Sequence, residues 1–372
     1  MKVKELKHVS CEKDFLCNKL INSYLIHSNK ILLDFFEFQS SNDKLVVIDV
    51  LDRINSIYQT MDQDIFVIVD LFQLDFLIHY FSKDLSNKLL KIKLNNCLYW
   101  KINNELFNVS DHPLIYGILN ITPDSFYDGG QYFSPKDVYE HINKMILAGT
   151  DIIEIGGQST RPGGYDEISV EEEKRRTIPV IKYIKHNFPK VLLAIDSYKE
   201  DVIYSALNED VDIVNDIHGF DTDEKVHMLA NSNAGMVLMH YNRTQNYTNV
   251  TNSIINFFKK RLGYLSEQSI DFSRVILDPG VGFLKIPDKN DDLTIMNNVS
   301  RFVSSLNRPI MTAISRKGFI EQLFGLDKDD RLPSTLVAES YMFLQGSNII
   351  RVHDINETKQ LIKLLDTIRQ SY

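Results

Sequence analysis

Polar residues of the kinds used in catalysis recur along this sequence, each directly after a short apolar stretch. Asn120 follows one stretch, Asp196 another and His240 a third. Asp278 and the triplet Ser-Arg-Lys at 315–317 follow two more. Any one of them fits a turn or a helix cap, but caps do not require acids, amides and cations in succession. Carboxylates and amides can bind the polar edge of a ring, and lysine or arginine can bind phosphate, so the set predicts a ligand site.

The stretches that precede these residues predict parallel strands buried on both faces. They are short and rich in Ile, Val and Leu, and a segment long enough for a crossover helix follows each. We place eight strands, at 114–119, 151–155, 191–195, 211–214, 235–239, 275–277, 309–314 and 348–352. Eight such units predict an α/β fold, the (β/α)8 TIM barrel, whose strands end at one catalytic face. A doubly wound open sheet is the alternative, but it normally has fewer units and a Gly-rich turn after its first strand.

A predicted hairpin precedes the first barrel strand. The segment "CLYWKINNELFNVSDHP" reads as two alternating strands joined at Asn103–Asn104, and this hairpin would cover the lower end of the barrel. The barrel domain, hairpin included, is therefore expected over residues 97–372.

The first part of the chain predicts a separate domain. Residues 1–93 show helical patterns and apolar runs, the former at 14–26 and 72–90 and the latter at 45–50 and 65–71. This alternation predicts a small α/β accessory domain, and nothing in it indicates a function.

Composition limits the partners of the chain. Its 372 residues are 44% hydrophobic, enough for a large core, and its net charge is −9 with a pI near 5.6. A surface that binds nucleic acid is normally basic, so none is expected as a partner. The three cysteines, Cys11, Cys17 and Cys97, lack metal-ligand spacing and fit a reducing cytoplasm. No apolar run reaches the ~18 residues of a membrane span, and the charged start "MKVKELKHVSCEKD" does not fit a secretory signal, so neither membrane nor export is expected.

Eight motifs, in order, resemble those of the dihydropteroate synthases of folate biosynthesis. They are "GILNITPDSFYDGG", "DIIEIGGQSTRPGG", "AIDSYKEDV", "DIVNDI", "LMHY", "ILDPGVGF", "SRKGFI" and "RVHD". The resemblance begins at about residue 97, and residues 1–93 have no counterpart in it. It implies a transferase that joins p-aminobenzoate to 6-hydroxymethyl-7,8-dihydropterin pyrophosphate, giving 7,8-dihydropteroate and pyrophosphate. It also implies a homodimer and a target of sulfonamides.

The resemblance implies a pterin site built from strand ends. Asp196, Asn215 and Asp278 would bind the edge of the ring, whose adjacent donors and acceptors need fixed carboxylates and amides opposite them. Lys317 would reach a ring acceptor and is a catalytic residue in this scheme. The faces of the ring would be enclosed by the side chains of Met239, Phe283 and Arg351.

Cations in this acidic protein fit the leaving group. Pyrophosphate carries several negative charges, and donors placed where charge accumulates assist its departure. The resemblance assigns pyrophosphate to Asn120, Arg161, Arg351 and His353, and it makes Arg351 catalytic as well. Asn120 would also be the protein ligand of a Mg²⁺ cofactor, an ion that prefers oxygen and keeps water and substrate phosphate in its shell.

Two glycine-containing loops would close over the substrates. "TPDSFYDGG" resembles the family's first loop and "QSTRPGGYDE" its second, and their closure would keep water from a pterin cation formed by loss of pyrophosphate. Asp124 and Asp128 of the first loop are the remaining catalytic residues that the resemblance implies, although turn formation is an alternative role for both. The p-aminobenzoate site would consist of Thr160, Arg161, Pro162, Phe283, Lys317 and Gly318.

Three positions depart from the family pattern. Gln158 stands where many members have Glu, Leu284 where Gly is usual, and Gly318 where Ser usually follows the lysine. The last two leave open a non-catalytic pterin-binding paralogue. A methyltetrahydrofolate-dependent corrinoid methyltransferase would share the barrel and the ring-edge residues, but it has no pyrophosphate to expel. Residues 1–93 are short for the pyrophosphokinase that is fused to some synthases.

Overall fold

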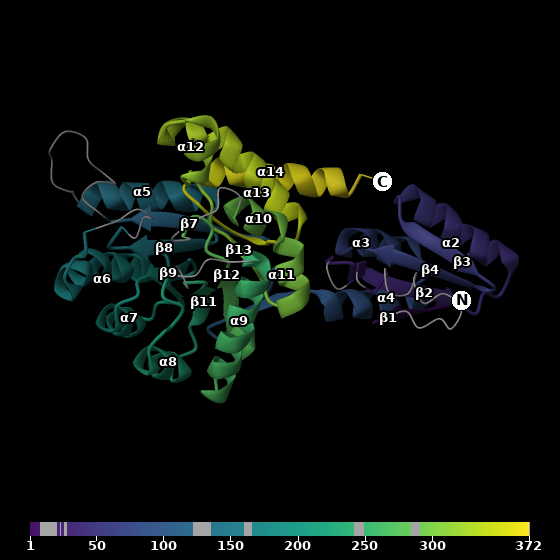
Figure 1. Cartoon of the computed structure of the whole chain (residues 1–372), viewed down its shortest axis with the longest axis horizontal. Helices are drawn as coiled ribbons and strands as arrows, with labels where there is room; N and C mark the ends of the chain where they lie inside the picture. Colours follow the sequence, from purple (N-terminus) through teal and green to yellow (C-terminus); the bar gives the residue numbers. More distant parts are fainter. Residues whose placement is uncertain are drawn as a thin grey trace. The chain divides into compact units, whose positions relative to one another are not determined.

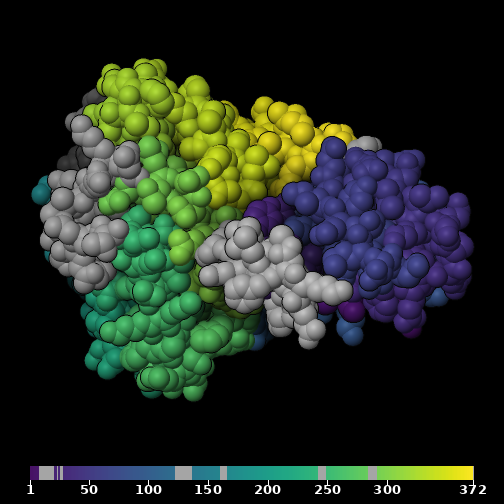
Figure 2. Space-filling model, turned by 45° about the vertical axis from the view of Figure 1, so that its right-hand side comes forward, coloured from purple at the N-terminus to yellow at the C-terminus, as the bar shows by residue number. Residues whose placement is uncertain are grey.

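The chain folds into two compact units (Figure 1). The structure, a computed structural model, describes residues 1–7, 21–22, 24–25, 28–121, 135–159, 166–241, 249–283 and 291–371. One unit comprises Met1–Leu98 with Lys363–Tyr372, and the other comprises Tyr99–Ile362. Figure 2 colours residues up to Leu98 purple to blue and the barrel that follows teal to yellow. Within the described ranges, no helix is both long and apolar enough to cross a bilayer.

Eight parallel strands form the second unit, as the sequence predicts. They are β7 (Leu114–Asn120), β8 (Ile152–Gly156), β9 (Leu192–Asp196), β10 (Ile213–Asp216), β11 (Gly235–Met239), β12 (Val275–Asp278), β13 (Met311–Thr312) and β14 (Ile349–Val352). Their order is β12-β11-β10-β9-β8-β7-β14-β13. A parallel bridge between Leu277 and Ile310, with the Leu277 N–H donating to the Pro309 carbonyl at 3.0 Å, joins the two ends into a barrel. The predicted run 309–314 is longer than β13, because only its centre pairs with β14.

Helices surround the barrel and alternate with its strands (Figure 1). In α9, for example, residues Ile254, Phe258, Leu262 and Leu265 recur every three or four positions and are all buried, which is the pattern of a helix packed by one face. The helices are α5 (Pro135–Ala148), α6 (Val170–Asn187), α7 (Glu200–Leu207), α8 (Asp223–Ala230), α9 (Val250–Glu267), α10 (Asp291–Asn297), α11 (Val299–Leu306), α12 (Phe319–Phe324), α13 (Leu332–Leu344) and α14 (Ile355–Arg369), with 3-10 turns η2 (Phe272–Arg274) and η3 (Lys328–Arg331).

The hairpin prediction is confirmed. Strands β5 (Tyr99–Ile102) and β6 (Glu105–Asn108) turn at Asn103 and Asn104, whose φ angles of 47° and 69° suit the tight hairpin turns that favour asparagine. The Trp100 indole N–H donates to the Arg274 carbonyl at 2.9 Å, and the Asn103 N–H donates to the Asn233 carbonyl at 3.0 Å. The hairpin is thereby fixed to the segments that lead into β11 and β12, at the end of the barrel opposite the predicted site.

The first unit is a small α/β structure, as predicted. Its antiparallel sheet has the order β1-β2-β4-β3, and the unit has a core that includes Leu33, Phe35, Val67 and Leu74. Its elements are β1 (Lys2–Leu6), β2 (Ile31–Phe36), α2 (Ser41–Arg53), β3 (Ile57–Met61), β4 (Asp64–Val69), α3 (Leu71–Tyr80) and α4 (Lys83–Asn96).

Two patterns in this unit correspond to different elements from those the sequence suggests. The apolar run 45–50 lies inside helix α2, because its buried residues Val47, Val50 and Leu51 follow helical spacing. The helical pattern 72–90 is two helices, α3 and α4, separated at Phe81 and Ser82. The pattern 14–26 lies largely outside the described residues.

A buried carboxyl group lies between α13 and the first turn of α14. Glu339 is 1% exposed and accepts a hydrogen bond from the Thr358 hydroxyl at 3.1 Å. Burial, with a smaller contribution from the Asp354 charge, raises the pKa of Glu339 from 4.5 to about 8. The folded protein therefore keeps a proton there that the unfolded chain releases at a lower pH.

We expect Glu339 to make the protein less stable as pH rises from about 4.5 to about 8, because the unfolded chain then binds fewer protons than the folded one. The slope from one such group approaches ~1.4 kcal/mol per pH unit at most. Glu339→Gln keeps an acceptor for Thr358 and should flatten this part of the profile. Thermal unfolding from pH 5 to pH 9 measures it, with Glu140→Gln on the exposed side of α5 as the control. Parallel profiles for Glu339→Gln and the parent protein would contradict the assignment.

Candidate active site

Alternate residues of a strand point to the same side, and strand register therefore decides which polar side chains meet. Asn120 is paired with Gly156, Gly156 with Asp196, and Asp196 with Asn215, across four neighbouring strands. Met239 and Asp278 are paired in the same way on β11 and β12. The register thus aligns Asn120, Asp196 and Asn215 at the carboxyl-terminal face, and Met239 and Asp278 lie two residues further along β11 and β12.

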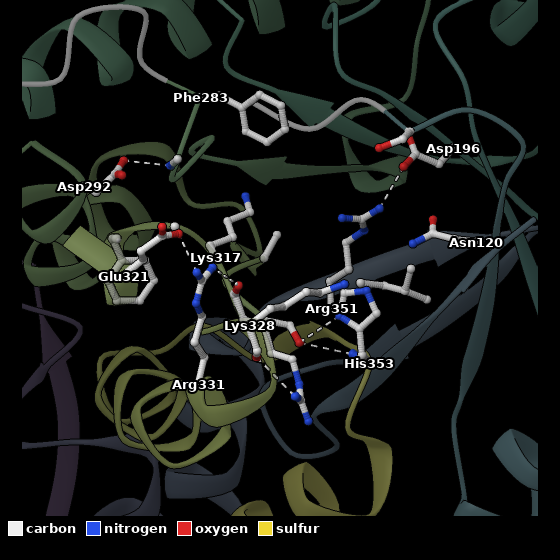
Figure 3. A pocket seen from close by; sticks show the side chains of 18 of the residues that line it. Asn120, Asp196, Phe283, Asp292, Lys317, Glu321, Lys328, Arg331, Arg351 and His353 are labelled. Carbon is white, nitrogen blue, oxygen red and sulfur yellow. Dashed lines mark hydrogen bonds and ion pairs between the residues drawn. The ribbon is translucent and has the colours of Figure 1, made fainter. Parts of the chain in front are cut away.

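Glu154 connects three of the residues at this face. Its side chain is buried on β8, where one carboxylate oxygen accepts from Asn215 Nδ2 at 2.8 Å and the other from Arg351 Nε at 2.6 Å. Arg351 Nη2 also donates to Asp196 Oδ2 at 2.8 Å (Figure 3). These contacts hold the Arg351 guanidinium between two carboxylates.

The same contacts fix the orientation of the Asn215 amide. Because Nδ2 of Asn215 donates to Glu154, its Oδ1 is directed elsewhere; this oxygen is buried and has no hydrogen-bond partner within the described ranges. An unpaired buried acceptor is costly, and a ligand that donates a hydrogen bond would satisfy it. Asn215 is therefore arranged to accept from a bound molecule.

Burial and neighbouring charges set the protonation of the two ring-edge acids. Burial and the Glu154 carboxylate raise the pKa of Asp196 to about 7, against the opposing effect of Arg351. Burial also raises the pKa of Asp278, whose carboxylate accepts from the Gly280 N–H at 2.8 Å and is stabilised in its charged form by Lys317. Both acids would gain from a ligand that donates hydrogen bonds.

Lys317 lies against the loop that follows β12. Its Nζ donates to the Val281 carbonyl at 2.5 Å and lies 4.6 Å from the centroid of the Phe283 ring. Gly282 allows this approach, since it has a φ of +83° and a Cβ there would come within 3.2 Å of the lysine side chain. The lysine and the aromatic ring are thus presented together.

His353 lies at the end of β14 and is neutral at pH 7. One ring nitrogen is 3.0 Å from the Ser315 hydroxyl. Burial lowers the pKa of His353 to about 4, and the positive charges of Arg351 and Lys328 act in the same direction. A neutral imidazole can offer a hydrogen bond to an anion without adding charge.

A pocket of about 420 Å³ opens above these groups (Figure 3). Seven predicted site residues line it: Asn120, Asp196, Phe283, Lys317, Gly318, Arg351 and His353. Asn215, Met239 and Asp278 are buried at neighbouring strand ends and do not line it. Asp124, Asp128, Thr160, Arg161, Pro162 and Leu284 lie outside the described residues.

The sequence analysis gave no role at this face to Glu154 or Gln158, and both make polar contacts there. Glu154 is an acid inside the apolar run of "DIIEIGG", with Gly156 two positions further on at the same face, and this alternation is the signal that could have found it. Gln158, a departure from the family pattern, lines the pocket and accepts from Lys199 Nζ at 2.7 Å and from the Ile168 N–H at 3.0 Å. An amide oxygen therefore serves as an acceptor at this position.

Comparison with known proteins identifies the class to which this barrel and its site belong. Residues 116–353 match the family model described as pterin binding enzyme, and the chain belongs to that family. Its relatives there include dihydropteroate synthases. That of Clostridium beijerinckii is 36% identical over 270 residues, which are 72% of this chain and 98% of the relative. That of Bacillus subtilis is 37% identical over 256 residues, 68% of this chain and 88% of the relative.

Solved structures of dihydropteroate synthases have the same fold as the barrel unit. The dihydropteroate synthase of Xanthomonas albilineans with 4-aminobenzoic acid superposes with a TM-score of 0.68 at 27% identity, covering 74% of this chain and 99% of that one. The Clostridium difficile enzyme, determined in the presence of pteroic acid, gives a TM-score of 0.66 at 33% identity, covering 71% of this chain and all of that one, 100%. The barrel unit therefore matches these two solved enzymes along nearly their whole length.

Proposed function

We infer that this chain is a dihydropteroate synthase, a transferase of folate biosynthesis that condenses 6-hydroxymethyl-7,8-dihydropterin pyrophosphate with p-aminobenzoate. The observation that carries the inference is the buried network of Glu154, Asn215, Arg351 and Asp196 under the pocket, which leaves the Asn215 oxygen ready to accept from a ligand. A dihydropterin ring edge carries N–H donors suited to such an acceptor. Membership of the pterin-binding family and the synthase relatives support the same reaction.

The pterin would bind over this network. Asp196, Asn215 and Asp278 accept from the donors of the ring edge, and Lys317 donates to a ring acceptor. The burial of Asn215 and Asp278 supports this role, because hydrogen bonds strengthen where water is excluded. The faces of the ring would contact Phe283 and Arg351, which line the pocket, and Met239, which is buried at the end of β11.

The diphosphate would lie toward Asn120, Arg351 and His353, with Arg161 of the second loop. Breaking the bond to the diphosphate leaves the electron pair on the departing oxygen, where these donors stabilise it. The p-aminobenzoate nitrogen then bonds to the pterin carbon and loses a proton. The resemblance also gives Asp124 and Asp128 a role beside the developing positive charge, and both lie outside the described residues.

A Mg²⁺ ion fits Asn120 as a single protein ligand. The described residues hold no cluster of three or more His, Cys, Asp or Glu side chains suited to a metal, and Asn120 is a half-buried amide on the pocket wall. Mg²⁺ commonly takes few protein groups and completes its shell with water and substrate phosphate. When bound, it would neutralise charge on the departing diphosphate.

The p-aminobenzoate would bind beside the pterin, against Phe283, Lys317 and Gly318. Lys317 lies over the Phe283 ring, so a cation and an aromatic face are available to a carboxylated ring. Gly318 is the residue before α12, and a Cβ added there would meet nothing within 4 Å. The second loop would complete the site with Thr160, Arg161 and Pro162.

A cytoplasmic setting with small-molecule partners fits this function. Cys97 is buried, and the three cysteines of the chain lack metal-ligand spacing, which suits a reducing compartment. The net charge of −9 disfavours nucleic acid as a partner.

An apolar face on α13 supports a homodimer. Val337, Tyr341 and Leu344 recur on one side of the helix and are 72%, 50% and 49% exposed, whereas Met342 and Phe343 on its other side are buried. Apolar side chains grouped at helical spacing on a surface indicate a protein contact. We propose a second copy of this chain as the occupant, because the face is self-complementary in chemistry and carries no charge.

The reaction itself is tested by pyrophosphate release with both substrates and Mg²⁺. We expect turnover in the parent protein and its loss when EDTA removes the metal. Lys317→Ala and Asp196→Ala should each lower kcat/KM at least tenfold, since a charge-assisted hydrogen bond is worth about 1.5–3 kcal/mol. Lys182→Ala, on the outer side of α6, is the control. Absence of turnover in the parent would indicate a non-catalytic paralogue. A parental rate in Asp196→Ala would show that Asp196 does not bind the ring edge.

Gly318→Ser should improve p-aminobenzoate binding. The position has space for the side chain, and an added neutral hydrogen bond contributes about 0.5–1.5 kcal/mol, so KM for p-aminobenzoate should fall roughly threefold to tenfold while KM for the pterin stays nearly constant. Sulfonamide inhibition should shift by a different factor, because the sulfonyl group replaces the carboxylate. Gly263→Ser on α9, where a Cβ also has space, is the matched control. Unchanged KM would mean that another group already makes this contact.

Val337→Glu should convert the dimer to a monomer of 43.1 kDa, because it buries a charge in the apolar contact. Light scattering coupled to gel filtration measures the mass. Leu147→Glu on α5, where an 86% exposed leucine stands, controls for adding a surface charge. A parent protein that runs as a monomer, or a Val337→Glu dimer, would refute this interface.

A further inference from the structure

The pocket extends past the predicted site residues to the 3-10 turn η3. Lys328 and Arg331 of this turn line the pocket together with Arg351 and His353. Figure 3 shows the Lys328 side chain extending toward His353. The sequence analysis gives Lys328 no role, and its position at the diphosphate end raises the question of what it binds.

Two arginines hold the backbone that presents Lys328. Arg316 Nη1 donates to the carbonyls of Lys328 at 3.3 Å and Asp329 at 3.1 Å, while its Nε and Nη2 donate to the Asp354 carboxylate at 2.9 and 2.8 Å. Arg331 donates to the carbonyls of Leu326 at 3.0 Å and Arg316 at 3.2 Å. The turn is therefore tied to β14 and to α12, and the lysine extends from a fixed base.

Three arginines that line the pocket form ion pairs with acids. Arg351 forms ion pairs with Glu154 and Asp196, Arg316 with Asp354, and Arg331 with Glu321. His353 is neutral. A diphosphate carries several negative charges, so cations that line the same end of the pocket would stabilise it when it binds.

Lys328 brings positive charge to the same end of the pocket. It is exposed, and its charge acts on the His353 ring in the same direction as that of Arg351. An ammonium group is a compact charge with three donors on a flexible stem, which suits the oxygens of a phosphate chain.

We propose that Lys328 binds the diphosphate of the pterin substrate, and the pyrophosphate released from it, alongside Arg351 and His353. The proposal rests on the function proposed above and deepens it by adding a residue that selects the diphosphate ester over the free pterin alcohol. In the reaction, Lys328 would share the negative charge that the departing oxygen gains when the carbon–oxygen bond breaks.

The test compares ligands with and without the diphosphate. In Lys328→Ala, the dissociation constant of inorganic pyrophosphate and the KM for the pterin diphosphate should rise roughly threefold to thirtyfold, as expected for an ion pair open to solvent on one side. Binding of 7,8-dihydropteroate, which has no diphosphate, and the KM for p-aminobenzoate should stay within twofold of the parent values. Lys328→Arg should retain most of the pyrophosphate affinity. Lys182→Ala removes a lysine from outside the pocket and should leave every value unchanged.

The two proposals fail in different ways. Calorimetric titration with pyrophosphate and Mg²⁺ requires no turnover, so it reports on Lys328 even in an inactive protein. A parent protein without turnover would overturn the proposed function. An active Lys328→Ala variant with parental pyrophosphate affinity would overturn the role of Lys328, as would equal losses for pyrophosphate and dihydropteroate, which indicate a structural effect.

Discussion

The Arg351 guanidinium, held between the carboxylates of Glu154 and Asp196, is the interaction on which the rest of the site depends. The Glu154 side chain is 1% exposed, and a buried charge is costly unless it is paired and hydrogen-bonded, so the arginine and both acids must be positioned together. Glu154 and Arg351 are 197 residues apart in the sequence and belong to β8 and β14. They meet because β14 pairs with β7 and β7 with β8, so the closure of the barrel is also the assembly of the site.

The barrel therefore has two parts: an apolar interior that supports the fold and a layer of polar strand ends that forms the site. The strands are buried and their apolar side chains fill the interior, while the polar residues lie at the strand ends. Glu154 lies on β8 two residues before Gly156, the partner of Asp196, and its carboxylate orients Asn215 and Arg351. The strands thus set the positions of the polar groups proposed to bind the ring.

The accessory unit shares none of these groups. Every described site residue lies within Tyr99–Ile362, and the family model matches residues 116–353. The first unit has its own sheet and its own core around Leu33, Phe35 and Val67. Its buried apolar surface is sufficient reason for it to fold as a separate body.

The sequence by itself determined the barrel and most of the proposed site. Buried parallel strands are continuous apolar runs, and the polar residue that ends each run is visible without coordinates, which is why Asn120, Asp196 and Asp278 could be named in advance. The run 45–50 was misleading because a short apolar stretch fits a strand and a buried helix face equally well.

The tertiary structure alone decided which of these groups interact. Glu154 stands inside an apolar run, and only the register of β8 with its neighbours turns it toward Asn215 and Arg351. Lys328 stands in a polar turn whose sequence has no distinctive pattern. Arg316, which is paired with Asp354, donates to the Lys328 carbonyl and fixes the backbone of this residue at the pocket wall. Local sequence fixes the period and the ends of an element, whereas an ion pair or a hydrogen bond between distant residues depends on how the elements close around a common centre.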